Sequence, residues 1–435
     1  MFIFSSVRAP FRRRKAVCSV SLALLLGAAL LPARPALALT LDEALRLALE
    51  RSRQLPAQDA AANASRQMAV AAGQRPDPIL KAGINNLPVD GPDRFSIGRD
   101  FMTMRSVGVM QELTRGSKLE ARSALFEREA EVAEASRELA LVNLQRDTAM
   151  AWLDRYYQER MREVLVSQRD EATLQIEAAD AAYRGGRGAQ SDVFAARSAV
   201  ALMEDRIAQT ERQIATAKTQ LARWVGTPAN EPPSTLPSLD TVSFRPEDLE
   251  SLVAHHPEIA VLAKREEMAQ ADVDVARAEK KSDVSVELMY SQRGSAYSNM
   301  ASINFSIPLQ WDQKDRQERG VAAKLATLEQ RRAEREEAVR MHVAEDLAMW
   351  QEWQSNRDRL TRYDQSLVPL ATERTKASIA AYRGASASLT AVLEARRGEI
   401  DTRLERLRLE MDTARLWAQL NYLVPTGHDA AHPAR

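Results

Sequence analysis

The sequence is poor in cysteine, glycine and aromatic residues. Its one cysteine, Cys18, lies in the N-terminal segment, which excludes disulfides and thiol chemistry from the rest of the 435-residue chain. Only 16 glycines and 5% aromatic residues, against abundant Ala, Glu, Arg and Leu, favour a mainly helical protein. No run of 18 or more apolar residues follows the N-terminal segment, so no transmembrane helix is predicted.

The signature motifs of enzymes are missing as well. The sequence contains no G-x-S-x-G, no glycine-rich phosphate loop and no metalloprotease motif. Its many neighbouring acidic and basic residues are typical of the solvated faces of coiled-coil helices. We therefore predict that the protein is not an enzyme and binds no cofactor.

Metal-ligand patterns are equally scarce. His255 and His256 are adjacent, so on a helix they would point about 100° apart and could not chelate through one face. There is no H-x₃-H or C-x₂-C pair. Three methionines share one face of a predicted strand and could attract a soft ion, although packing explains such a stripe as well: Met102, Met104 and Met110. We predict no metal site.

Residues 1–38 are typical of a secretory signal peptide. A basic stretch from Arg8 to Lys15 precedes the apolar stretch Ala16–Leu31 and the cleavage motif Ala36-Leu37-Ala38. Removal of this segment leaves 54 basic against 60 acidic residues, a net charge of −6. A mildly acidic surface argues against a nucleic-acid partner, and an exported chain without cysteine fits a periplasmic or outer-membrane protein.

Two long helical hairpins are predicted from apolar residues spaced seven apart, the spacing of coiled-coil contacts. No proline occurs between Thr114 and Thr227, and the first helix of about 68 residues would be roughly 100 Å long. The helix after its turn carries a ladder of five: Val193, Val200, Ile207, Ile214 and Leu221. Two further ladders follow in the second half: Trp353, Leu360 and Leu367, then Leu393, Ile400, Leu407 and Ala414.

Four strands are predicted from alternation of apolar and polar residues. The clearer pair is Ser282–Tyr290 and Ala301–Leu309, and a fainter pair is Leu80–Asn85 and Phe101–Leu113. Strands of about ten residues with one apolar face are typical of tilted strands that cross a bilayer. Four strands cannot close a barrel, whereas three chains would supply twelve.

The turns of the two hairpins are copies of one motif. Residues 182–197, AYRGGRGAQSDVFAAR, and residues 381–396, AYRGASASLTAVLEAR, are identical at seven of sixteen positions, 199 residues apart. The duplication predicts a signal peptide (1–38), a first structural repeat (39–236), a linker (237–243), a second repeat (244–425) and a disordered tail (426–435). Each repeat would contain a helix, a strand pair and a long helical hairpin.

This order of elements behind a signal peptide resembles the TolC-like outer-membrane efflux protein family over about Leu39–Val424. The first turn fits the family motif best, with Tyr183, Gly186, Asp192 and Val193 followed by the pair Ala196-Arg197. The resemblance implies a mainly α fold with a small β part. It implies a homotrimer with a 12-stranded transmembrane β-barrel in outer-membrane lipid, continued by a periplasmic α-barrel.

The resemblance also implies partners and a transport role. The protein would be the exit duct of a tripartite system, docking with a periplasmic adaptor (membrane fusion) protein and an inner-membrane pump of the resistance-nodulation-division (RND) type. The stretches Arg75–Gly91 and Arg99–Lys118 look most like the heavy-metal branch, whose members export cobalt, zinc and cadmium or copper and silver. Transport through this exit duct would be passive.

Site residues follow from the family's turn motif. The resemblance implies that the tips contact the adaptor through Gly185, Gly186 and Arg187 and through Gly384, Ala385 and Ser386. It implies a periplasmic gate with a latch between Asp192 and Tyr382, and an acidic constriction in which Glu394 matches one position. Ala391 stands where the family has the other carboxylate, and Ala385 where it usually has glycine.

Pro369, about thirteen residues before the second turn, should kink that hairpin alone, which suggests that the second hairpin moves when the entrance opens. Two rival functions stay open: a duct for drug efflux or type I secretion, and a soluble periplasmic coiled-coil scaffold. The strand pair Ser282–Tyr290 and Ala301–Leu309 argues against the scaffold, because a soluble protein needs no such apolar outer face.

Overall fold

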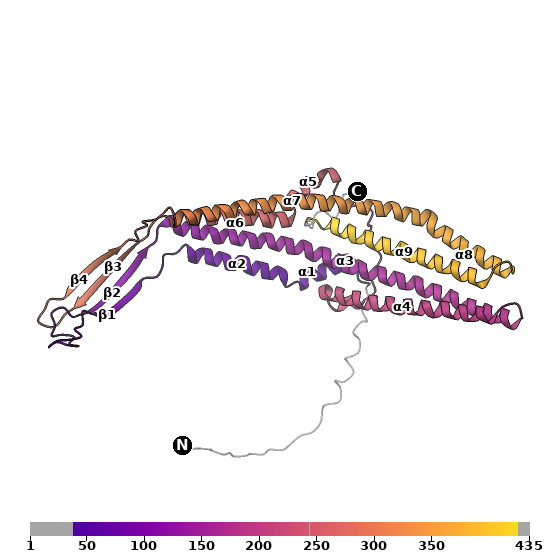
Figure 1. Ribbon diagram of the computed structural model, residues 1–435, viewed down its shortest axis with the longest axis horizontal. Helices are drawn as coiled ribbons and strands as arrows, with labels where there is room; N and C mark the ends of the chain where they lie inside the picture. Colours follow the sequence, from indigo (N-terminus) through magenta and orange to yellow (C-terminus); the bar gives the residue numbers. More distant parts are fainter. Residues whose placement is uncertain (1–37, 243, 425–435) are drawn as a thin grey trace, which may run out of the picture. The chain divides into compact units, whose positions relative to one another are not determined.

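The computed structural model describes residues 38–242 and 244–424. The predicted signal peptide, up to residue 37, and the predicted tail, residues 426–435, lie outside the described residues. Residues 39–424 belong to one compact unit. It contains two runs of elements in the same order: two helices, two strands, a very long helical segment and a returning helix (Figure 1).

The first run comprises α1 (Leu41–Arg51), α2 (Gln54–Ala72), β1 (Ile79–Asn85), β2 (Met104–Leu113), α3 (Gly116–Arg184) and α4 (Gln190–Val225). The second comprises α5 (Leu249–Ala254), α6 (Pro257–Glu279), β3 (Val284–Gln292), β4 (Met300–Ser306), α7 (Gln317–Arg362), α8 (Val368–Arg383) and α9 (Leu389–Asn421). Short 3₁₀ turns at Thr227–Asn230 and Pro246–Asp248 lie between them. The predicted mainly helical fold with a small sheet is confirmed.

Helix α3 is the axis of the fold. It has 69 residues and packs against α2, α4, α6 and α9. The predicted ladder on α4 is buried at every rung, from Val193 to Leu221, so the seven-residue spacing marks the side that contacts α3. Near the middle of α3, Trp152 is fully buried and its indole donates to the carbonyl of Leu39 at 3.0 Å. Large side chains at this level form the main core, which joins both hairpins to Leu39, Leu41 and Ala44.

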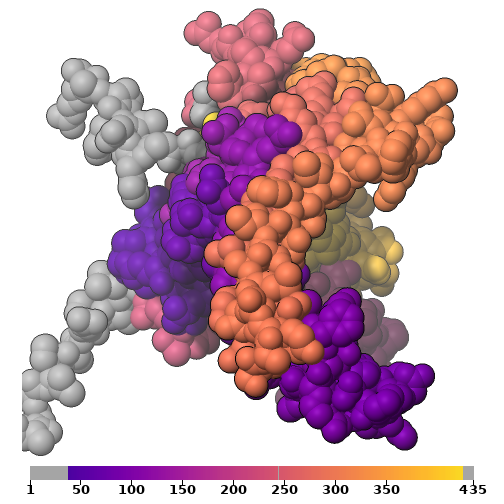
Figure 2. Space-filling model, turned by 90° about the vertical axis from the view of Figure 1, so that its left-hand side faces the viewer, coloured from indigo at the N-terminus to yellow at the C-terminus, as the bar shows by residue number. Residues whose placement is uncertain are grey.

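The sheet has the order β1-β2-β3-β4, with every neighbouring pair antiparallel. It lies at the end of the long helices opposite the two turns (Figure 1). Figure 2 looks onto this end, where the purple β1–β2 segment and the orange β3–β4 segment lie at the front. The central pair β2–β3 joins the two runs of elements, because Arg105 is paired with Gln292 and Leu113 with Val284.

Two strands are shorter than predicted. Strand β2 begins at Met104 rather than Phe101, because the Asp100 carboxylate accepts the N–H groups of Met102 and Thr103 and holds that segment in a turn. Strand β4 ends at Ser306 rather than Leu309, because Pro308 has no N–H to donate to a ladder. The Pro308 carbonyl instead accepts the hydroxyl of Ser282 at 2.7 Å.

One face of the sheet is apolar and exposed. The register places two rungs of apolar residues across all four strands: Leu80, Val109, Leu288 and Ile303, then Ala82, Val107, Tyr290 and Ala301. Leu288 and Ile303 are 58% and 63% exposed. The opposite face carries polar groups, including an ion pair between Lys81 and Glu287 at 3.1 Å. An apolar face of this kind requires cover by something other than water.

The segment from α7 to α8 is interrupted at the predicted place. A π-helical turn, Tyr363–Leu367, separates the two helices immediately before Pro369. Proline lacks the N–H that a regular helix would donate there and its ring clashes with the preceding turn, and the wide turn accommodates both. The extra residue also ends the predicted ladder: Trp353 is buried, but Leu367 is 46% exposed. Helix α8 bends away from the line of α7 (Figure 1).

Among the described residues, no helix is both long and apolar enough to span a membrane.

Candidate functional site

The two copies of the turn motif fold identically. In the first, the N–H groups of Gly185, Gly186 and Arg187 donate to the carbonyls of Ala181, Tyr183 and Ala182 at 2.9–3.0 Å. In the second, Gly384, Ala385 and Ser386 make the three equivalent bonds at the same lengths. All six predicted tip residues are exposed, at the far end of the hairpins from the sheet (Figure 1).

The second turn carries a strain that the first avoids. Gly186 has a φ of 70° and the equivalent Ala385 a φ of 56°, so the alanine is held in the left-handed region. This region costs an alanine about 1–2 kcal/mol and glycine little. The motif therefore keeps its shape without glycine, at a cost in local stability.

We expect Ala385→Gly to stabilise the second turn by about 0.5–1 kcal/mol, after the greater chain entropy of glycine is subtracted. Amide hydrogen exchange at residues 384–388 should slow accordingly. Gly186→Ala is the matched reverse change and should speed exchange in the first turn by a similar factor. Faster exchange in Ala385→Gly would contradict the strain argument.

The helices that follow the two turns, α4 and α9, each have one of the two hydrogen bonds of a capping box. In the first copy, the Asp192 carboxylate accepts the N–H of Ala189 at 3.3 Å. In the second, the Ser388 hydroxyl accepts the N–H of Ala391 at 3.3 Å. A complete capping box would have both bonds, and each copy keeps one. The difference between Asp192 and Ala391 noted in the sequence is therefore compensated locally.

The tips of the two hairpins pack together. A small apolar cluster contains buried residues from both, namely Ala179, Val193, Ala196, Leu389 and Val392, with the Tyr382 ring partly buried against it. Asp192 lies next to this cluster in sequence but points to its own helix cap. Within residues 38–242 and 244–424 of one chain, no hydrogen bond joins Asp192 to Tyr382. The latch between them stays a prediction for the assembled protein.

Glu394, the third predicted gate residue, is exposed on α9. It lines a cavity of about 370 Å³ between α4 and α9, together with Leu202, Arg206 and Arg397. The structure thus places Tyr382 against the tip cluster, Asp192 at the start of α4 and Glu394 further along α9. The three predicted gate residues therefore do not form one site within a single chain.

Three ion pairs that sequence patterns did not indicate join α9 to the first hairpin. They are Arg396 with Glu171 at 2.5 Å, Arg206 with Asp401 at 2.8 Å, and Arg415 with Asp154 at 2.6 Å. Arg396 is only 5% exposed, whereas its copy in the first hairpin, Arg197, is exposed. Partners about 195 to 261 residues apart leave no local pattern to detect.

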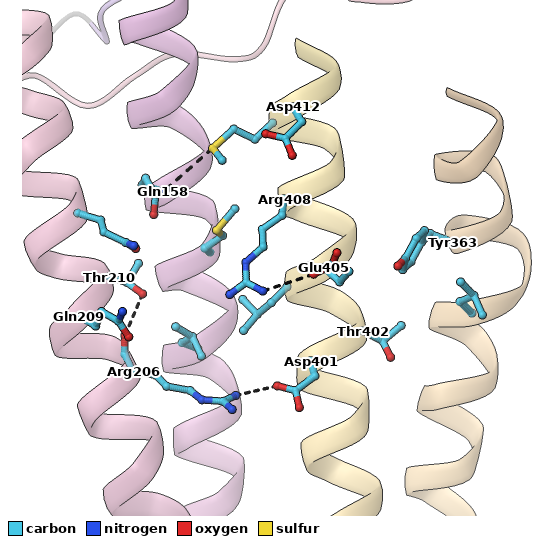
Figure 3. Close-up of a pocket in the computed structure, with 16 residues that line it drawn as sticks. Gln158, Arg206, Gln209, Thr210, Tyr363, Asp401, Thr402, Glu405, Arg408 and Asp412 are labelled. Carbon is cyan, nitrogen blue, oxygen red and sulfur yellow. Dashed lines mark hydrogen bonds and ion pairs between the residues drawn. The ribbon is translucent and has the colours of Figure 1, made fainter. Parts of the chain in front are cut away.

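A larger cavity lies between the hairpins and borders the Arg206–Asp401 pair. It has a volume of about 830 Å³ and is lined by α3, α4, α9 and the π-helical turn (Figure 3). Arg206 and Asp401 close one end, and Gln158 reaches Met411 near the other (Figure 3). Tyr363 and Leu367 of the π-helical turn border it. The second hairpin is therefore loosely packed at the place where its helix is interrupted.

Only one group of side chains in the described part of the chain could act as metal ligands: His256, Glu258 and His342. The methionine stripe is divided, because Met102 lies in a turn and only Met104 and Met110 are in β2.

The comparisons with known proteins agree with this fold. Residues 44–227 match the family model described as outer membrane efflux protein. This segment is thus similar to outer membrane efflux proteins. It holds the first hairpin and with it Gly185, Gly186, Arg187 and Asp192, whereas the second copy of the turn lies beyond the match. The sequence has no significant match among curated proteins.

Solved outer-membrane channels share the fold of most of this chain. The outer membrane protein VceC of Vibrio cholerae superposes with a TM-score of 0.72 at 20% identity, over 88% of this chain and 95% of that one. The outer-membrane channel OprN gives 0.74 at 17% identity, over 88% and 89%. CusC gives 0.72 at 15% identity, over 89% and 92%. The similarity to this family model and to these channels places the protein at the outer membrane, with the long helices extending into the periplasm.

Proposed function

We propose that the protein is the exit duct of a tripartite efflux system. The observation that carries this proposal is the separation of two surfaces on one molecule: an exposed apolar sheet face at one end and paired hairpin tips at the other. The apolar sheet face can contact lipid, and the hairpin tips can contact a periplasmic partner. Transport would be passive, with energy and selection supplied by the inner-membrane pump.

A single chain is an incomplete duct, which favours a homotrimer. Strands β1 and β4 each have one unpaired edge, and open edges are not tolerated in lipid. Three copies would join β4 of one chain to β1 of the next and give twelve strands in a closed barrel. We further propose that residues 39–236 and 244–425 are the two structural repeats and residues 237–243 their linker.

The tips are proposed to dock the periplasmic adaptor of an RND-type pump. Gly185, Gly186 and Arg187 in one turn and Gly384, Ala385 and Ser386 in the other are exposed and small apart from the arginine. Small residues let another helix pair approach closely. A Cβ placed on Gly186, the left-handed residue of the first turn, would meet nothing within 4 Å, so this side of the tip is open to such an approach.

The cargo is proposed to be a heavy-metal cation. This rests on the stretches Arg75–Gly91 and Arg99–Lys118 and on the presence of CusC among the similar channels, beside OprN and VceC. Deletion of the gene should lower resistance to zinc, cadmium, cobalt, copper or silver more than resistance to a panel of drugs. The opposite ranking would favour drug efflux, and recovery of the protein in the detergent-free periplasmic fraction would rule out both channel functions.

The predicted latch can be separated from the helix cap. Asp192→Ala removes both the carboxylate of the latch and the helix cap. The double variant Ala189→Ser, Asp192→Ala removes the carboxylate but keeps a cap, because it copies the arrangement in which Ser388 caps α9. We expect this double variant to raise the conductance of the purified protein in planar bilayers at unchanged helix stability. Unchanged conductance would show that Asp192 does not hold the gate.

A further inference from the structure

The start of α6 meets the middle of α7 through a compact group of imidazole and carboxylate side chains. His256 and His342 lie with ring centroids 4.5 Å apart. The Glu258 carboxylate lies 3.2 Å from Nε2 of His342. One candidate ligand atom from each of these three residues falls within 4.8 Å of the others. We propose that His256, Glu258 and His342 bind one divalent transition-metal ion of the Zn²⁺ class, in the wall of the helical part.

The residue types suit such an ion. Two imidazoles and a carboxylate are a common ligand set for zinc, with bonds of about 2.0–2.2 Å. Ligand atoms around one ion are at most about 4 Å apart at these bond lengths, so the group needs only small side-chain rotations to close. The 3.3 Å bond from the Glu258 N–H to Nδ1 of His256 is long, and its loss on binding costs little.

The surroundings leave polar atoms that lack partners. In the described part of the chain, Oδ2 of Asp346 is buried without a hydrogen bond, and Nε2 of His342 is buried with only the 3.2 Å contact to Glu258, which lacks hydrogen-bond geometry. Asp346 is 2% exposed and follows His342 by one helical turn, on the same side of α7. A buried carboxylate without a partner is costly, and a neighbouring cation would remove the cost. The negative charge of Asp346 would thus offset the positive charge of the ion. It would act either as a fourth ligand or through the imidazole of His342.

The ion would act as a structural link. Leu249, Val253 and Ile259 form a buried apolar cluster beside the group, with Val339 and Val343 of α7 packed against it. An apolar shell of this kind excludes water from a metal site and strengthens binding. The ion would join α6 to α7 across 84 to 86 residues of sequence. This inference does not depend on the proposed exit-duct function.

The test uses the full chain, purified in detergent without a polyhistidine tag and stripped of metal with a chelator. His428→Gln and His432→Gln remove the two histidines outside the described residues, which leaves His255, His256 and His342. Titration with Zn²⁺ by calorimetry should give one ion per chain. Co²⁺ should give the intense visible absorption of a low-coordinate site with nitrogen and oxygen ligands.

In this background, His342→Gln should lower Zn²⁺ affinity by at least about 100-fold. His255→Gln is the matched control. His255 is exposed and its ring bonds only to the Ser251 carbonyl in the described structure, so this change should not affect affinity. Glu258→Gln changes a side chain that is 46% exposed and so keeps the test valid if a histidine variant fails to fold. Absence of Zn²⁺ binding in the background protein, or equal losses in His255→Gln and His342→Gln, would overturn the proposal.

Discussion

Replacing Leu288 and Ile303 by lysine is expected to prevent the protein from entering the outer membrane. The two residues are directly paired between β3 and β4 at the centre of the apolar face, and both are more than half exposed. A lysine on the lipid side of a membrane strand costs about 2–4 kcal/mol near the middle of the bilayer. Two such costs approach the whole stability of an ordinary domain, about 5–15 kcal/mol.

The measurement is the amount of protein recovered in washed outer membranes relative to total expression. The matched control carries the same two added charges on the opposite face of β4, as Ser302→Lys and Asn304→Lys. Asn304 is paired with Glu287, which favours a lysine there. We expect the control to reach the membrane at near the unmodified level. Equal recovery of both variants would show that the apolar face does not contact lipid.

Cross-linking α4 to α9 is expected to abolish transport. If the second hairpin moves when the entrance opens, α9 must separate from the first hairpin. Arg206 and Asp401 join these helices at 2.8 Å and are 37% and 50% exposed, so cysteines at both positions are accessible to a reducible bifunctional reagent. The chain has no other cysteine beyond Cys18, so the reagent has no competing target after the N-terminal segment.

Transport is measured as resistance to the exported toxin in cells that also contain the pump and adaptor. The cross-linked double variant should lose resistance, and reduction of the linker should restore it. The control places cysteines at Arg162 and Glu211, an equally exposed ion pair at 2.9 Å between α3 and α4 of the first hairpin. That link joins helices that move together and should leave resistance intact. Survival of transport with α4 linked to α9 would place the moving part elsewhere.

The looseness of the second hairpin gives this experiment its physical basis. The π-helical turn Tyr363–Leu367 removes Leu367 from the ladder that Trp353 begins, and the cavity between the hairpins borders the same turn. The first hairpin has no such helix interruption within the described residues, since α3 runs through 69 residues as one helix. Motion is therefore easier where side-chain packing is already incomplete.

Periodicity in the sequence was sufficient for the elements and for the faces that they bury. The rungs from Val193 to Leu221 are all buried, and Pro369 lies at the interruption of its helix, because spacing and proline act on the local backbone. Strand ends were less accurate. Phe101–Thr103 alternates like a strand, but the nearby Asp100 carboxylate offers its backbone a turn instead.

Only the tertiary structure decided which distant residues meet. Arg396 and its copy Arg197 are equivalent in the sequence motif, yet only Arg396 is buried and paired with Glu171 of α3, whereas Arg197 on α4 is exposed. His256 is adjacent to His255 in the sequence, whereas the imidazole that it contacts belongs to His342 on another helix. The sequence by itself thus determined the helices, strands and duplicated turns, which depend on residues within a few positions. The contacts between hairpins and the histidine group depend on packing between helices, which no local pattern records.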